Sequence, residues 1–82
     1  MDIAVDISLY PLEQDFVPPI REFIDRLGTD PRLKVVTNSL STQLTGPYEV
    51  VMETLTRELR PSFERGTKSV FVVKLLGPLP AY

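Results

Sequence analysis

The stretch Val35–Gly46, VVTNSLSTQLTG, has the β-branched side chains of two strands, but in its last ten residues only Leu40 and Leu44 are apolar. This pattern predicts a tight hairpin, with one strand at about 33–39 and the next at roughly 41–45. In a chain this short, most strand positions are needed to build a core. The hydroxyls and amides of the hairpin therefore need an explanation.

The segment before the hairpin predicts a strand followed by a helix. Asp2–Tyr10 alternates, with apolar side chains at the odd positions from Ile3 onward, which is typical of a half-buried strand. The proline-rich segment Pro11–Pro19 ends this strand, and Gly28 ends the helix that follows. The apolar face of this helix consists of Ile20, Phe23, Ile24 and Leu27.

The segment after the hairpin predicts a second helix and a last strand. The helix is expected to begin with Pro47 as its first residue, and Pro61 should either end it near Arg60 or bend it. Its apolar stripe is expected to consist of Tyr48, Val51, Met52, Leu55, Leu59 and Phe63. The last strand, Ser69–Leu76, is apolar on both faces except for Lys74, and the tail from Gly77 to Tyr82 should be irregular.

The resulting βαββαβ order predicts a single domain over residues 1–82, of the α+β class. Right-handed crossovers give the ferredoxin-like sandwich, an antiparallel four-stranded sheet in the order four, one, three, two with two helices on one face. Opposite charges four residues apart predict ion pairs on the outer helix faces. These pairs are Arg21 with Asp25, Glu22 with Arg26, and Glu53 with Arg57.

The composition restricts the possible functions. The chain has no cysteine and no histidine, which excludes thiolate and imidazole catalysis and the common zinc sites, and no cofactor is expected. A net charge of −2 gives no basic surface for nucleic acid, and no apolar run is long enough to span a membrane. We therefore expect a cytoplasmic protein that is not an enzyme. A domain of this size is marginally stable alone, so oligomerisation is expected to add stability.

The face of the sheet away from the helices is expected to be uncovered by the chain itself. Val70, Val72 and Leu76 should form an apolar strip there beside Tyr10, and Lys74 could pair with Asp6 across the neighbouring strand. Such a strip favours a second subunit that covers it. The alternative is that the strand register or the C-terminal tail hides part of this face.

The second strand of the hairpin is internal in the predicted order, so its polarity is not explained by an exposed edge. Thr42 should face the helices with Leu44, whereas Ser41, Gln43 and Thr45 should face the open side. Their polar groups need partners from another chain, water or a ligand. Alternatively, the threonines are present as good strand formers, and their hydroxyls bond locally.

The loop Pro11–Pro19 is acidic and contains no glycine, so it should repel a phosphate, which argues against a phosphoryl-transfer enzyme. Glu13 and Asp15 in this loop are expected to be solvated rather than to hold a cation. Tyrosines, amides and hydroxyls near the hairpin are instead the groups that bind a flat heterocycle. The candidate ligand-binding residues are Tyr10, Asn38, Ser41, Thr42 and Tyr48.

Four segments together resemble the YkoF-like family of thiamine and hydroxymethylpyrimidine binding proteins and its single-domain relatives. They are ISLYPL, VPPIREFIDRL, VVTNSLSTQLTGPYEVVMETL and KSVFVVKL, which together span nearly the whole chain. The most specific of these is the run from the second strand into the second helix. The resemblance implies a ferredoxin-like fold, subunits joined through their sheets, commonly as tetramers, and a role in salvage or uptake rather than chemistry.

The leading interpretation is therefore a non-enzymatic binding protein for thiamine or its hydroxymethylpyrimidine precursor. In it, Asn38 and Thr42 would hydrogen-bond the pyrimidine, Ser41 would assist, and Tyr48 or Tyr10 would pack on the ring. The alternative is an oligomeric regulatory or interaction module in which the polar hairpin is a subunit interface and the small-molecule ligand is different or absent.

Overall fold

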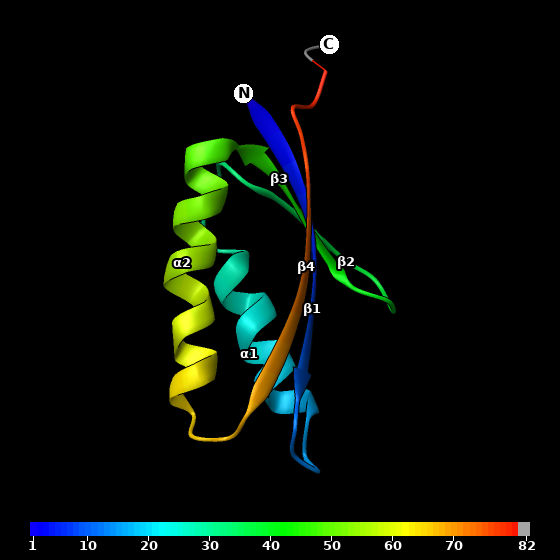
Figure 1. The fold of residues 1–82 in the computed structure, drawn as a ribbon, viewed down its shortest axis with the longest axis vertical. Helices are drawn as coiled ribbons and strands as arrows, with labels where there is room; N and C mark the ends of the chain where they lie inside the picture. The colour runs from blue at the N-terminus through cyan, green and yellow to red at the C-terminus, as the bar shows by residue number, and fades with distance from the viewer. Residues whose placement is uncertain (81–82) are drawn as a thin grey trace.

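The computed structural model describes residues 1–80, which form one α+β domain (Figure 1). Its elements are β1 (Asp2–Pro11), α1 (Val17–Leu27), β2 (Lys34–Thr37), β3 (Thr42–Pro47), α2 (Tyr48–Glu64) and β4 (Ser69–Leu76). Residues 77–80 are irregular as predicted, and the predicted irregularity of Ala81 and Tyr82 lies outside the described residues. No helix within residues 1–80 is long and apolar enough to cross a bilayer.

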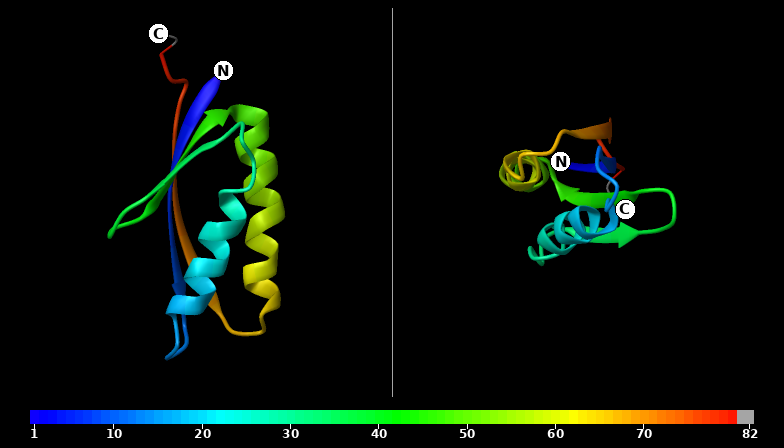
Figure 2. Two further views of the ribbon diagram at one scale, coloured as in Figure 1. Left: turned by 180° about the vertical axis from the view of Figure 1, so that it is seen from behind. Right: turned by 90° about the horizontal axis from the view of Figure 1, so that it is seen from below.

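The four strands form one antiparallel sheet in the order β2-β3-β1-β4, with both helices on the same side (Figures 1 and 2). This confirms the ferredoxin-like topology and the internal position of β3. The hairpin strands differ from the prediction in their bounds, because β2 ends at Thr37 and β3 continues to Pro47. Residues 38–41 therefore form the turn of the hairpin.

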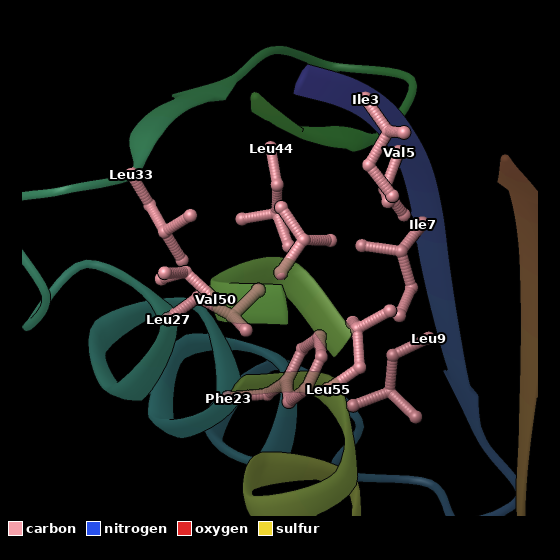
Figure 3. Close-up of a cluster of buried hydrophobic side chains, with 11 residues drawn as sticks. Ile3, Val5, Ile7, Leu9, Phe23, Leu27, Leu33, Leu44, Val50 and Leu55 are labelled. Carbon is pink, nitrogen blue, oxygen red and sulfur yellow. The ribbon is translucent and has the colours of Figure 1, made fainter. Parts of the chain in front are cut away.

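The core lies between the sheet and the helices (Figure 3). The odd residues of β1 all point into it, as their alternation predicts, and Phe23 and Leu27 of α1 and Leu44 of β3 are almost fully buried. The remaining core residues are Leu33, Val50, Val51 and Leu55. Phe23 also contacts Phe71 of β4 edge-to-face, with ring centroids 5.1 Å apart, which attaches the edge strand to the core.

The prediction for α2 was wrong at its first residue and at two positions of its apolar stripe. The helix begins at Tyr48 after Pro47, and it continues past Pro61 to Glu64, so Pro61 does not end it near Arg60. Val51 and Leu55 are buried and Met52 and Leu59 pack against the core as predicted. Tyr48 and Phe63 are exposed, however, and three polar residues beside the stripe, Thr54, Glu58 and Ser62, are buried. Glu58 and Ser62 have a polar partner on α1.

Arg26 of α1 is the polar partner of Glu58 and Ser62. Its guanidinium donates hydrogen bonds to the Glu58 carbonyl (3.1 Å) and to the Ser62 hydroxyl (3.0 Å), and its Nε lies 3.5 Å from a Glu58 carboxylate oxygen. Arg57 also pairs with Glu58, at 3.1 Å. A carboxylate with two cationic partners can be buried between the helices without an unpaired charge.

The predicted ion pairs along the helices do not form among residues 1–80, and three of their six members pair with other residues instead. Arg26 and Arg57 both pair with Glu58, and Glu22 pairs with Arg65 beyond the end of α2. Asp6 and Lys74 are opposite each other in the strand register, as expected, but the Asp6 carboxylate accepts a hydrogen bond from Ser41.

The turn before β2 packs closely on β3. Hydrogen bonds from the Arg32 side chain and backbone lower the pKa of Asp30 to about 2, so this carboxylate stays ionised and holds the turn. Gly46 of β3 lies directly below the turn, where a Cβ atom would come within 2.6 Å of Leu33 Cδ2 and 3.1 Å of the Arg32 carbonyl oxygen. Only glycine fits there without displacing the turn.

Gly46→Ala should therefore reduce the free energy of unfolding by about 1–3 kcal/mol, because the added methyl group overpacks this contact. Gly28→Ala is the matched control, since a Cβ atom there would lie 3.8 Å from its nearest neighbours and its φ of −80° suits alanine. Urea denaturation of both variants tests the expectation. Equal stabilities of the two variants would show that the turn is not packed on Gly46.

Candidate functional site

A cleft of about 480 Å³ lies between the start of α1, the end of β1 and the turn of the β2–β3 hairpin. The hairpin turn extends away from the helix layer, which leaves this region of the domain without a covering element (Figure 2). The volume is within the range of about 300–1,000 Å³ for small-molecule sites. The lining residues are Ile7–Leu12, Phe16, Ile20, Phe23, Ile24 and Thr37–Thr42.

The cleft has an apolar floor and an aromatic mouth. Ile7, Leu9 and Phe23 are buried members of the core, and Figure 3 shows their side chains directed into the same cluster between β1 and the helices. Phe16 lies on the loop before α1 and is 52% exposed. An exposed aromatic ring beside an apolar cleft is a suitable surface for stacking on a flat ligand.

Asn38 organises the turn that forms one wall. Its side-chain oxygen accepts hydrogen bonds from the backbone N–H groups of Leu40 (2.9 Å) and Ser41 (3.1 Å), and its own N–H donates to the Ser41 carbonyl (3.0 Å). This is an Asx-type turn, which fixes the chain direction without glycine. The Asn38 oxygen is therefore occupied, and its amide NH₂ is the part that can donate to a ligand.

Thr37 and Thr42 are opposite each other at the end of the hairpin, and their hydroxyl oxygens are 3.0 Å apart. Thr42 is 4% exposed and faces the helix side with Ile7, its register partner on β1. The two hydroxyl groups carry two protons, and one of these protons forms the hydrogen bond between them. The threonine pair can therefore donate one further hydrogen bond and accept others at the apolar wall of the cleft.

Ser41 borders the cleft, but its hydroxyl donates to the Asp6 carboxylate on the open face of the sheet. Gln43 on the same face donates to the Ser41 hydroxyl at 3.4 Å. The polarity of the hairpin therefore has two explanations, one for each face. Thr37 and Thr42 face the cleft, whereas Ser41 and Gln43 form a network with Asp6 on the other side.

The structure brings four of the five predicted site residues to this cleft: Tyr10, Asn38, Ser41 and Thr42. Tyr10 lies at the end of β1, but strand alternation places its side chain on the open face in register with Val70. Tyr48 lies at the opposite end of β3, where its N–H donates to the Met1 carbonyl, and it does not line the cleft.

Sequence reasoning missed the aromatic and hydroxyl groups that face the cleft most directly. Phe16 was part of a loop considered only for its charges, and Phe23 was assigned to the core alone. Thr37 was read as an ordinary strand residue, although its position opposite Thr42 follows from the hairpin. Pairing the two strands around a four-residue turn would have brought the two threonines together.

Comparison with known proteins identifies the family. A sequence model of the YKOF-related family matches residues 2–75. The fold is shared with a Streptococcus pneumoniae protein of known structure, at a TM-score of 0.87 and 21% identity, with 96% of this chain and 89% of that chain covered. Comparison with curated proteins found no match.

Two further solved structures have the same fold. A hypothetical protein from Methanocaldococcus jannaschii aligns at a TM-score of 0.83 and 17% identity, covering 99% of this chain and 84% of that one. A protein from Thermotoga maritima, named as a candidate thiamine biosynthesis or salvage protein, aligns at 0.81 and 18% identity, covering 92% and 82%. The chain therefore belongs to the YKOF-related family and has its βαββαβ fold.

The hairpin turn should depend on the Asn38 acceptor rather than on its amide. Asn38→Ala removes the acceptor of two hydrogen bonds and should reduce the free energy of unfolding by about 1–2 kcal/mol. Asn38→Asp keeps an acceptor oxygen and should retain most of the stability. Ser39→Ala, at an exposed neighbour in the same turn, is the control. Thermal unfolding in which alanine and aspartate at position 38 are equivalent would contradict this role.

Proposed function

We propose that this protein binds thiamine or its hydroxymethylpyrimidine precursor in the hairpin cleft, without transforming it, as part of thiamine salvage or uptake in the cytoplasm. The observation that supports this most is the composition of the cleft, in which apolar and aromatic residues surround a few uncharged hydrogen-bonding groups. A pocket of this kind suits a flat, uncharged heterocycle. The family and the named role of the Thermotoga maritima neighbour agree with such a ligand.

An aminopyrimidine has ring nitrogens that accept hydrogen bonds and an exocyclic amine that donates them. The remaining proton of the Thr37–Thr42 pair and the Asn38 amide can donate to ring nitrogens, and the threonine oxygens can accept from the amine. Phe16 can stack on the ring from the mouth of the cleft. This set of groups differs from the sequence prediction in two ways, since Phe16 replaces the two tyrosines and Thr37 replaces Ser41.

A binding role is favoured over a catalytic one because no side chain that titrates near neutral pH is among those that line the cleft within residues 1–80. General acid–base catalysis requires such a group within hydrogen-bond reach of the reacting atom. The polar groups that are present, hydroxyls and one amide, can recognise a ligand by hydrogen bonding.

Titration calorimetry with hydroxymethylpyrimidine and with thiamine tests the proposal. Saturable binding at a stoichiometry of one ligand for each cleft is expected. The absence of binding at millimolar ligand, with the protein shown to be folded, would overturn it.

Thr42→Val should weaken binding of hydroxymethylpyrimidine about 3- to 10-fold, because it removes one neutral hydrogen bond at nearly constant volume. Thr45→Val, on the same strand but facing the open side, is the matched control and should bind as the unaltered protein does. Calorimetry on both variants measures the difference. Identical affinities for the two would place the ligand away from Thr42.

We further propose that the protein is a homo-oligomer, assembled through the open face of the sheet as a dimer or as a tetramer of two dimers. Val70, Val72 and Leu76 are 46%, 47% and 66% exposed there, and Tyr10 beside them is 54% exposed. An apolar strip of this kind, interrupted only by Lys74, favours burial against a second copy on a small domain. The polar network of Asp6, Ser41 and Gln43 lies on the same face and would give the contact specificity.

Val72→Asp should convert the oligomer to a monomer, because it places a charge in the centre of the buried strip. Val17→Asp is the matched control, since Val17 is 48% exposed but lies at the start of α1, away from the open face. Sedimentation equilibrium gives the masses. A monomeric unaltered protein, or an oligomer that survives Val72→Asp, would contradict assembly through this face. Dissociation with unchanged ligand affinity would show that each cleft is complete within one subunit.

A further inference from the structure

We propose that the cleft accepts the free alcohol form of its ligand and excludes the phosphate esters of the same compound. This inference rests on the proposed function, and it specifies which chemical form of the heterocycle is bound. A binding protein for a phosphate ester needs cations or unpaired N–H donors where the phosphate lies. Four features of the described residues leave the cleft without a cation and with few unpaired backbone N–H donors.

The first feature is the charge of the cleft walls. None of the residues that line the cleft in the described part of the chain is charged. Arg65, beyond the end of α2, is the cation that contacts the loop before α1. Its guanidinium lies 2.7 Å from a Glu22 carboxylate oxygen and 3.5 Å from one of Glu13. With two carboxylates as partners, this cation is already neutralised.

The second feature is the beginning of α1, near which Phe16 and Ile20 line the cleft. The first turn of a helix normally presents unpaired N–H groups that bind anions. Here Pro18 and Pro19 follow Val17 and supply no N–H, so two of the usual donors are missing. The start of this helix therefore offers fewer N–H donors to a phosphate than a helix start without prolines would.

The third feature is the hairpin turn, which could otherwise donate through its backbone. The N–H groups of Leu40 and Ser41 both donate to the Asn38 side-chain oxygen, and the N–H of Asn38 donates to the Ser41 carbonyl. These three donors are consumed within the turn. A phosphate placed here would have to break existing hydrogen bonds to obtain new ones.

The fourth feature is the acidic loop between Leu12 and Phe16, both of which line the cleft. Asp15 is exposed in this loop and is placed in no ion pair within residues 1–80, whereas Glu13 is paired with Arg65. The negative charge of Asp15 opposes a phosphate at the mouth of the cleft. The same charge attracts the cationic thiazolium ring of thiamine, so thiamine and the neutral hydroxymethylpyrimidine are both acceptable ligands.

A phosphorylated ligand would therefore lose water from its most strongly hydrated group and find no cation in the cleft to replace it, with three backbone N–H groups of the hairpin turn already bonded. The ligand must be released before a kinase-type reaction phosphorylates its hydroxyl, and it can enter the cleft only after any phosphate has been removed by hydrolysis. The protein would then bind the ligand before its phosphorylation or after the hydrolysis of its phosphate ester.

The test is a calorimetric comparison of thiamine with thiamine monophosphate and thiamine diphosphate at one ionic strength. We expect the monophosphate to bind at least about 20-fold more weakly than thiamine and the diphosphate more weakly still. Phosphate esters that bind within about threefold of thiamine, or more tightly, would overturn the inference while leaving the proposed function standing. No binding of thiamine, hydroxymethylpyrimidine or either ester would overturn the proposed function and the inference together.

A charge reversal in the acidic loop identifies the cause. Asp15→Lys should strengthen monophosphate binding at least about fivefold and weaken thiamine binding. Glu53→Lys, an equal change of charge at an exposed position on α2, should alter neither. Equal effects of the two substitutions would show that net charge, and not the charge of this loop, controls the selectivity, which would contradict the inference.

Discussion

The position of two helices over a four-stranded sheet determines which surfaces of this domain can be used. α1 and α2 pack chiefly on β1 and β3, where the core residues Val5, Ile7 and Leu44 are almost fully buried. The edge strand β4 keeps only Phe71 against the core, so Val73 and Leu75 remain 40% and 57% exposed even on the helix side. At the other edge, the hairpin turn extends beyond α1 and leaves the cleft open (Figure 2).

This incomplete coverage is compatible with a stable fold because the helices are joined to each other by polar as well as apolar contacts. Arg26 reaches across from α1 to Glu58 and Ser62 of α2, and Arg65 joins the loop before α1 to the end of α2. These contacts hold the two helices together beside the cleft. The cleft has a firm floor of core residues and a wall whose turn is closed by Asn38.

The sequence predicted the topology because strand alternation and helix spacing are local properties. The odd positions of β1, the face of Thr42 and the internal position of β3 all followed from this reasoning, and the structure confirms them. The apolar part of the buried face of α2 was predicted, but its polar part could not be, because Glu58 and Ser62 are buried only where Arg26 from a distant segment meets them. Polar residues with a nonlocal partner resemble surface residues in a single sequence.

The candidate site was also predicted only in part, because it too depends on contacts between distant segments. Asn38 and Thr42 were found because their polarity was unusual for a strand pair, but Ser41 resembles them in sequence and forms its hydrogen bond on the other face. Tyr48 is only six residues from Thr42, yet the length of β3 separates them. Phe16 gave no signal because an aromatic residue in a loop is unremarkable until the cleft beside it is known.

The claim that the hairpin cleft is the binding site is tested most directly by nuclear magnetic resonance of the ¹⁵N-labelled protein during titration with hydroxymethylpyrimidine. The account predicts that amide shift changes concentrate at residues 37–42, at the end of β1 and around Phe16. Shift changes concentrated on β4 and the open face, or at Tyr48, would contradict the account, because they would show that the ligand binds outside the cleft.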